Sequence, residues 1–289
     1  MLNLALIQAK VSLMDIDEAA GRLDRWFEQC PSAAVAFSGG VDSALVAYWG
    51  RRWLGRDRCT AWTADSPSLK RSDLAIAQAF CADHDIALRL LKTGEINDPK
   101  YASNPTDRCF HCKSNLYQTL LAELAKSPGE VWVCSGANLD DQGDYRPGLV
   151  AAANASVRHP LLECGIGKET IRALAKQYGL SVWDKPASPC LSSRIPYGQP
   201  VTVEKLAQIE AAEGWMREHG FAVCRVRHYG ESARIEVPAD RIQALKAVWP
   251  ELCAAFVELS FVNVELDSEG FVSGKLNRAI GKADAKATS

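Results

Sequence analysis

The chain has 289 residues, of which 47% are hydrophobic and 24% are charged. This is an ordinary composition for a globular enzyme, and the length suggests about two domains. The formal net charge of -2 gives no global positive field of the kind that draws dedicated nucleic-acid-binding proteins to phosphate, so we expect no nucleic-acid partner.

Targeting signals are not evident in the sequence. No stretch approaches the roughly 18 apolar residues that a membrane span needs. Residues 1–13 include a short apolar stretch, but they lack the basic region and the small-residue cleavage site of a secretory signal. We therefore expect a cytoplasmic protein with no membrane partner.

Apolar runs of strand length alternate with amphipathic stretches over the first two thirds of the chain. The predicted strands cover residues 33–37, 59–63, 86–91 and 131–134, and the predicted helices cover residues 17–29, 43–54, 71–84, 108–126 and 168–178. This alternation predicts an α/β fold with a doubly wound parallel sheet that helices cover on both faces.

The pattern changes after residues 185–200, a segment with four prolines and three serines. Beyond it we predict a helix at 202–219 and strands at 221–227, 233–237 and 256–266, which together make a smaller α+β domain. We therefore predict one domain over residues 1–194 and a second over residues 195–289. The Ala/Lys-rich residues after Gly281 predict a disordered tail.

The sequence Ser-Gly-Gly-Val-Asp-Ser, residues 38–43, stands between a predicted strand and a predicted helix. Backbone N–H groups and the helix dipole converge at such a point and bind anions. Gly39 and Gly40 allow a phosphate to approach the backbone, Ser38 and Ser43 add hydroxyl donors, and Asp42 can hold the Mg²⁺ that accompanies a nucleotide. A glycine turn with Asp42 and Ser43 as helix caps is the simpler alternative.

This hexapeptide is the signature of the PP-loop ATP pyrophosphatases, and it lacks the Gly-Lys-Ser/Thr of a Walker A loop. The resemblance implies that the chain binds ATP, cleaves it between the α and β phosphates, and moves AMP onto an oxygen of the substrate. It does not imply phosphoryl transfer to a hydroxyl group.

Further motifs narrow the resemblance. Ser-Gly-Ala-Asn-Leu-Asp-Asp at residues 135–141 follows a predicted strand, at the edge where parallel sheets bind ligands, although a plain Asn/Asp-rich turn would look similar. The chain closely resembles the LarE family from about residue 17 to about residue 278. The other motifs that carry this resemblance are Thr-Ala-Asp-Ser-Pro-Ser at 63–68, Asp-Tyr-Arg-Pro-Gly at 144–148, Cys-Leu-Ser-Ser-Arg-Ile-Pro-Tyr-Gly at 190–198 and Arg-Ile-Glu-Val at 234–237.

The LarE resemblance implies an ATP-dependent sulfur transferase. ATP would adenylate a carboxylate of a biscarboxylated pyridinium mononucleotide, and sulfur would displace AMP to give a thiocarboxylate, a step toward the nickel-pincer cofactor of lactate racemase. A carboxylate is a poor electrophile, and AMP gives it a good leaving group. The resemblance also implies that Asp65 and Gly136 contact the nucleotide, and that the smaller domain binds substrate and forms a homo-oligomer.

The sequence contains ten cysteines. A free thiol packs as a small hydrophobe, so we expect Cys30, Cys59, Cys81, Cys134 and Cys253, which have apolar neighbours, to be plain core residues. In a reducing compartment some of the others are more suited to metal, cluster or catalytic roles than to disulfides.

Cys109 and Cys112 form a C-x-x-C motif at the start of a predicted helix, where one helix face and the dipole would favour thiolates. By resemblance, Cys190 would join them to hold a 4Fe-4S cluster whose open iron carries a sulfide. In some family members the cysteine matching Cys190 instead gives up its own sulfur. The motif alone also fits a redox pair, plain helix cysteines, or a zinc site with His111, which we expect to face away.

Arg194, Arg225 and Arg227 can meet the phosphate of a mononucleotide, because a guanidinium group binds phosphate oxygens in a bidentate way. Arg225 and Arg227 are two residues apart in a predicted strand and so share a face, and Ser193 adds a hydroxyl donor. A solvated strand face is the alternative.

Glu213 and Glu236 fall where the LarE family has acidic metal ligands, although carboxylates at such positions are often simply solvated.

Two other functions fit the phosphate loop. A PP-loop enzyme that thiolates a tRNA base would use the same ATP chemistry, but the near-neutral charge argues against it. A non-catalytic ATP-responsive or cluster-carrying protein would not need the intact loop with Asp42.

Overall fold

The computed structural model describes residues 14–126, 129–142, 146–272 and 275. The predicted absence of an N-terminal signal and the predicted tail after Gly281 therefore concern residues outside the described ones. Within the described residues, no helix has the length and apolar character needed to cross a membrane.

The chain forms two compact units. The first comprises the described residues up to Ala64 together with Asp73–Leu91 and Tyr117–Ser188, and the second comprises Asp65–Ser72, Lys92–Leu116 and the described residues from Pro189 onward. The second unit thus takes in two segments that precede residue 195 in the chain. The division into domains at residue 195 stays a prediction.

A four-stranded parallel sheet with the order β3-β2-β1-β4 forms the centre of the first unit. Its strands are β1 (Ala33–Ala36), β2 (Cys59–Ala64), β3 (Ala87–Leu91) and β4 (Trp132–Cys134). All of β1 is buried, as expected for a central strand with helices on both faces. The chain leaves β1 toward β2 and later returns to β4 on the other side, so β1 and β4 flank a topological switch point, where open α/β sheets bind ligands.

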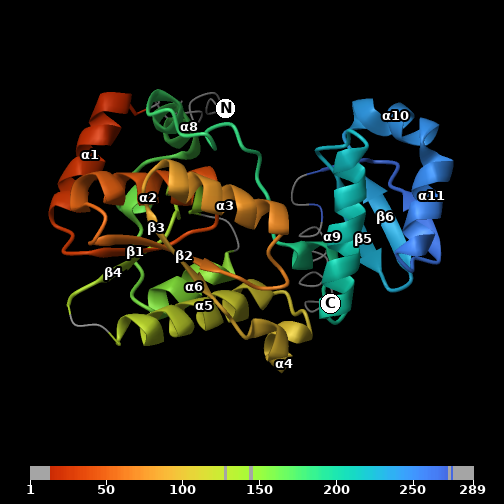
Figure 1. Ribbon diagram of the computed structural model, residues 1–289, viewed down its shortest axis with the longest axis horizontal. Coiled ribbons are helices and arrows are strands. Elements are labelled where there is room, and N and C mark those ends of the chain that lie inside the picture. Colours follow the sequence, from red (N-terminus) through yellow and green to blue (C-terminus); the bar gives the residue numbers. More distant parts are fainter. Residues whose placement is uncertain (1–13, 127–128, 143–145, 273–274, 276–289) are drawn as a thin grey trace, which may run out of the picture. The chain divides into compact units, whose positions relative to one another are not determined.

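Helices cover both faces of this sheet (Figure 1). One face carries α1 (Ile16–Glu28), α2 (Val41–Leu54), α3 (Arg71–Asp83) and α8 (Lys168–Gln177), and the other carries α6 (Pro147–Asn154) and the part of α5 (Arg108–Leu124) from Tyr117 onward. The predicted doubly wound parallel fold is confirmed. The structure adds the short α7 (Pro160–Glu163) and a 3-10 helix, η2 (Leu139–Asp141).

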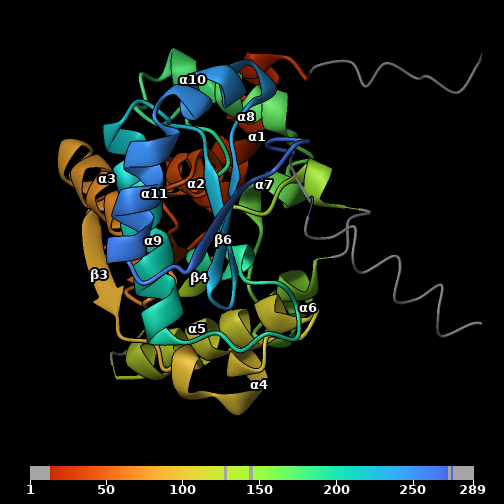
Figure 2. The same ribbon diagram turned by 90° about the vertical axis from the view of Figure 1, so that its right-hand side faces the viewer.

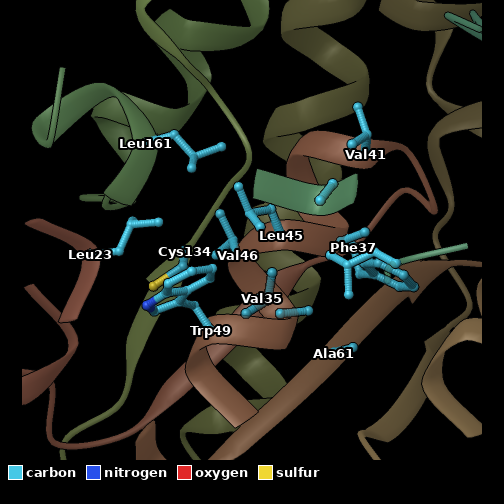
Figure 3. Close-up of a cluster of buried hydrophobic side chains, with 14 of the residues drawn as sticks. Leu23, Val35, Phe37, Val41, Leu45, Val46, Trp49, Ala61, Cys134 and Leu161 are labelled. Carbon is cyan, nitrogen blue, oxygen red and sulfur yellow. The ribbon is translucent and has the colours of Figure 1, made fainter. Parts of the chain in front are cut away.

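The core of the first unit lies between the sheet and the helices on the face that carries α2 (Figure 3). Helix α1 contributes Ala19, Leu23 and Phe27, whose spacing of four residues places them on one face. Trp49 of α2 is fully buried, and its indole Nε1 donates to Asp24 Oδ1 at 2.8 Å. The prediction of core cysteines is confirmed for Cys30, Cys59, Cys81 and Cys134, whereas Cys253 is half-buried and packs at the edge of the second unit's core.

The second unit contains a three-stranded sheet with the order β5-β6-β7 (Figures 1 and 2). Strands β5 (Arg225–Tyr229) and β6 (Ser232–Glu236) are antiparallel, and β7 (Asn263–Leu266) runs parallel to β6. The helices are α9 (Val203–Glu218), which packs on β5, α10 (Ile242–Ala247), and α11 (Trp249–Glu258), which packs on β7. Earlier segments add α4 (Pro99–Ala102), and the 3-10 helices are η1 (Glu95–Asn97), η3 (Leu191–Arg194) and η4 (Ala239–Arg241).

Three sequence predictions differ from the observed elements. The predicted strand 256–266 is wrong in its first half, because Phe256 and Leu252 are spaced for one helix face and are both buried in α11. The predicted strand at 221 begins only at Arg225. Between the predicted strand 86–91 and the predicted helix 108–126, where no element is predicted, the structure has α4, with Pro99 in its first turn and Asp98 as its N-cap.

Gly50 offers a test of packing between α2 and its neighbours. A Cβ at Gly50 would lie 2.7 Å from Cys59 Sγ and 3.2 Å from Phe27 Cε1. We expect Gly50→Ala to lower the free energy of unfolding by about 1–3 kcal/mol, because β2 and α1 would have to move. As a control, a Cβ at Gly21 would meet only the end of Arg25, at 3.5 Å, so Gly21→Ala should stabilise by about 0.5–1 kcal/mol. Thermal unfolding midpoints that rise in both variants would contradict the close packing at Gly50.

Candidate functional site

The predicted phosphate loop joins the end of β1 to the start of α2. Gly39 has a φ of 69°, and a Cβ there would lie 3.2 Å from Ala77 Cβ, so a side chain would be both strained and crowded. The backbone N–H of Ser38 donates to Ser43 Oγ at 3.1 Å, which closes the loop on itself. Gly40 is the N-cap of α2 and provides no side-chain cap, which leaves first-turn N–H groups available to an anion.

The loop after β4 packs directly on the first turn of α2. A Cβ at Gly136 would lie 2.6 Å from the backbone nitrogen of Ser43 and 2.9 Å from the carbonyl carbon of Asp42. Only glycine allows this approach. Asn138 Nδ2 donates to Asp42 Oδ1 at 3.4 Å, and the Asn138 side chain also caps η2. The structure therefore brings together Gly136 and the hexapeptide, as the order of the strands requires.

Two lysines that the motifs do not include bind this loop. Lys168 Nζ lies 2.6 Å from Asp42 Oδ1 and 2.5 Å from Asp42 Oδ2. Lys185 Nζ donates to the Gly39 carbonyl at 2.9 Å and lies 3.0 Å from Asp73 Oδ1. Glycines that permit close backbone approach, an uncapped helix start and nearby ammonium groups suit a polyphosphate with its divalent cation. The role of Asp42 as a Mg²⁺ ligand stays a prediction.

Ser135, the first residue of the 135–141 motif, and His159, which no motif includes, support the β4 loop. Ser135 Oγ and His159 Nδ1 lie 2.8 Å apart, and Ser135 Oγ accepts from the N–H of Ala137 at 3.3 Å. Burial lowers the pKa of His159, with an opposing effect from Glu163. The imidazole holds the turn through its hydrogen bond with Ser135 Oγ.

Asp65, a predicted nucleotide contact, belongs to the second unit. Its Oδ1 lies 2.5 Å from Arg71 Nη1, so its carboxylate is engaged in an ion pair. Neighbouring Ser66 and Ser68 are buried, with their hydroxyl oxygens 2.8 Å apart. The nucleotide contact of Asp65 stays a prediction.

The three cysteines singled out by the sequence all belong to the second unit. Cys109 and Cys112 lie in the first turns of α5, and Cys190 precedes η3. Cys109 and Cys190 are exposed and Cys112 is half-buried. The expected preference for thiolates is wrong for the helix pair. Desolvation and a negative charge on Cys190 raise the pKa of Cys109, and together with further charges they raise that of Cys112 to about 12.

Over residues 14–126, 129–142, 146–272 and 275, no three His, Cys, Asp or Glu side chains are placed to hold one metal ion. The cysteine trio as placed therefore does not form a ready-made cluster or zinc site. His111 lies beside Asp107, with Nε2 3.6 Å from Oδ2.

Buried polar residues surround the trio. Arg108 is 3% exposed, and its Nη1 donates to Asn104 Oδ1 at 2.6 Å and to the Ser192 carbonyl at 2.9 Å. The Tyr101 hydroxyl lies 2.6 Å from Ser192 Oγ, and burial raises the pKa of Tyr101. These contacts fix the chain at Ser192, two residues after Cys190.

Two of the three predicted substrate arginines form buried ion pairs with the two predicted metal-binding glutamates. Arg194 is fully buried, with Nε 2.8 Å from Glu213 Oε1 and Nη2 3.0 Å from Glu213 Oε2. Arg227 makes the same fork to Glu236, at 3.0 and 2.8 Å. Lys70 Nζ adds a contact of 3.3 Å to Glu213 Oε2.

The ion pairs and the further contacts of Nη1 together occupy most of the hydrogen-bond donors of both arginines. Arg194 Nη1 donates to the Cys190 carbonyl at 3.1 Å and to Ser193 Oγ at 2.8 Å, and Arg227 Nη1 donates to the Ser193 carbonyl at 2.7 Å. Arg225 is half-buried, its guanidinium lies 5.0 Å from the Phe271 ring centroid, and burial lowers its pKa. The roles of these residues and of Ser193 in substrate binding, and of the two glutamates in metal binding, stay predictions.

The parallel sheet, its switch point and the glycine loop together define an α/β domain of the PP-loop type. The chain combines this domain with an α+β unit. No family model matches the sequence. The chain is 36% identical to pyridinium-3,5-bisthiocarboxylic acid mononucleotide synthase of Lactiplantibacillus plantarum, over 86% of this chain and 90% of that protein. The chain belongs to the LarE family, to which this synthase belongs.

Two further relatives carry no assigned function. An uncharacterized protein of Synechocystis is 44% identical over 90% of this chain and 97% of its own length. An uncharacterized protein of Methanocaldococcus jannaschii is 27% identical over 81% of this chain and 88% of its own length. The similarity therefore extends through both compact units.

Glu213 offers a test of the buried ion pairs. Burial alone would raise the pKa of Glu213, but Arg194 and Lys70 hold it below its ordinary value of 4.5. A carboxylate with a depressed pKa stabilises the fold above its ordinary pKa, and that stabilisation is lost as the pH falls through the folded-state pKa. We expect Glu213→Gln to lower the free energy of unfolding near neutral pH by about 3–5 kcal/mol, since Arg194 would keep an unpaired buried charge.

Urea unfolding at several pH values measures both effects. Acid destabilisation below the ordinary glutamate pKa should be weaker in Glu213→Gln than in the wild type. Glu218→Gln, an exposed position on the same helix, is the control and should change stability by less than about 0.5 kcal/mol. A stable Glu213→Gln protein would show that the pair is not a structural one.

Proposed function

We propose that the chain is an ATP-dependent sulfur transferase of nickel-pincer cofactor biosynthesis. Its substrate would be a pyridinium biscarboxylic acid mononucleotide, and its product would carry a thiocarboxylate in place of a carboxylate. The observation that carries this proposal is the 36% identity, over 86% of the chain, to a protein named for synthesis of the bisthiocarboxylic acid mononucleotide.

The phosphate loop supports the first half of the reaction. A carboxylate oxygen of the substrate would attack the α-phosphorus of ATP, and the bond to the β-phosphate would break, giving an acyl adenylate and pyrophosphate. The glycine loop and the start of α2 would hold the phosphates, and Asp42 would hold the Mg²⁺ that accompanies them. Sulfur would then attack the carbonyl carbon and expel AMP.

Product analysis tests this proposal. With ATP, Mg²⁺ and pyridinium-3,5-biscarboxylic acid mononucleotide, we expect AMP and pyrophosphate in equal amounts, because the loop carries the adenylating motif and not a Walker A lysine. Mass spectrometry should show substrate in which one carboxylate oxygen is replaced by sulfur. Formation of ADP and free phosphate, or no ATP consumption with this substrate, would overturn the proposed function.

The sulfur source has two candidate forms, and both involve Cys190. In the first, which we favour, Cys109, Cys112 and Cys190 would hold a 4Fe-4S cluster that supplies a sulfide. Their common location in one compact unit, and the effect of Cys190 on the pKa of the other two, support this form. In the second, Cys190 would give its own sulfur. Its exposed position, and the placement of the trio without a ready metal site, support that alternative.

Cysteine variants separate the two forms. If a cluster delivers sulfur, Cys109→Ala and Cys112→Ala should each abolish repeated turnover and the iron and acid-labile sulfide of anaerobically purified protein, because each would remove one iron ligand. Cys253→Ala, a half-buried cysteine outside the trio, is the control. Full multi-turnover sulfur transfer in both variants would show that Cys190 acts without a cluster.

A cytoplasmic location and a homo-oligomeric state stay predictions.

A further inference from the structure

An ion pair inside the phosphate loop joins Asp42 to Lys168, a residue outside every motif in the sequence. The ammonium group contacts both carboxylate oxygens, at 2.6 and 2.5 Å. Asn138 is the other side chain that donates to this carboxylate, at a longer distance of 3.4 Å. Lys168 is therefore the close cationic partner of the residue that is expected to hold the nucleotide's Mg²⁺.

The backbone of Lys168 is fixed, while its side chain can reach solvent. Lys168 is the first residue of α8, and its N–H donates to Asp140 Oδ2 at 2.5 Å. A Cβ at the preceding Gly167 would lie 3.1 Å from the same oxygen, so this helix start is packed against η2. The two side chains of the pair are 39% and 24% exposed, which makes both accessible to a ligand from solution.

The charges at this point require such a cation. A polyphosphate at the start of α2 would meet the negative carboxylate of Asp42 in the first turn of the same helix. Like charges at close range oppose binding, so Asp42 has to be neutralised. Lys168 does this in the nucleotide-free protein. A divalent cation that bound Asp42 together with a nucleotide would displace the ammonium group, which would then be available to the phosphates.

Lys185 differs from Lys168 in a way that excludes it from this role. Its ammonium group is tied to the Gly39 carbonyl at 2.9 Å and to Asp73 at 3.0 Å. The side chains of Lys185 and Asp73 are only 13% and 11% exposed. Lys185 therefore supports the shape of the loop and has no exposed path to exchange partners.

We propose that Lys168 is an exchangeable counter-ion, which neutralises Asp42 in the nucleotide-free protein and contacts the β- and γ-phosphates when the Mg²⁺ nucleotide is bound. This inference rests on the proposed function. In the adenylation step, Lys168 would neutralise the charge that develops on the pyrophosphate as its bond to the α-phosphorus breaks. Lys168 would thereby assist the leaving group without any proton transfer.

Binding measurements on the full chain test the inference without relying on turnover. We expect Lys168→Gln to weaken the binding of Mg²⁺-ATP and of pyrophosphate at least about tenfold, because a charge-assisted contact to these groups is lost. The affinity for AMP should change less than about threefold, since AMP lacks both outer phosphates. Mn²⁺ should bind the nucleotide-free variant more tightly than the wild type, because its competitor for Asp42 is gone. Lys168→Arg should retain most of the affinity for ATP.

Lys176→Gln is the matched control, because Lys176 lies on the same helix with its ammonium 4.8 Å from the Trp183 ring centroid. It should bind all four probes as the wild type does. Wild-type affinity for ATP in Lys168→Gln, or equal weakening of ATP and AMP, would overturn the inference alone. Failure of the wild type and the control to bind ATP would overturn the proposed function and, with it, this inference.

Discussion

The first unit depends on one close backbone contact, the approach of Gly136 to the first turn of α2. This contact exists because β4 pairs with β1 in parallel, with Trp132 beside Ala33 and Cys134 beside Val35, so that the two loops leave the sheet at the same level. A shift of one residue in that register would turn every side chain of β4 to the opposite face and move Gly136 away. The buried strand β1 and the glycine loop are therefore parts of one constraint, which places Asn138 and Lys168 in contact with Asp42.

The second unit follows a different electrostatic principle. Its arginines and glutamates form bidentate pairs inside the protein, and the contacts of Arg194 extend to the carbonyl of Cys190. Buried ion pairs add little net stability, but they define one arrangement of the chain because each alternative leaves an uncompensated charge. Burial raises the pKa of Cys109 and of Cys112 in the same unit.

The sequence predicted the strands of the first unit and the glycine loop because these depend on local periodicity and on short motifs. Contacts between distant residues were beyond it. Lys168 and Lys185 reach the loop across 126 and 146 positions, and nothing in their own surroundings marks them. The ion pair between Arg227 and Glu236 could more nearly have been predicted from the sequence. In the β5-β6 hairpin Arg225 lies opposite Glu236, which makes Arg227 the diagonal neighbour of Glu236, but only the register of the turn decides this. Single charged residues in a sequence look like ligands until their partners are known.

The two kinds of ion pair predict where the protein can rearrange. Breaking a buried pair such as Arg194 with Glu213 costs about 3–5 kcal/mol, because one charge stays behind without a partner. An exposed pair contributes about 0–1 kcal/mol, so exchange of its partner costs little. The pair of Lys168 with Asp42 is partly exposed and belongs to the second kind. Ligand-driven changes in side-chain partners should therefore occur at the phosphate loop, while Arg194 and Arg227 keep their forks and present a fixed framework to any substrate that binds beside them.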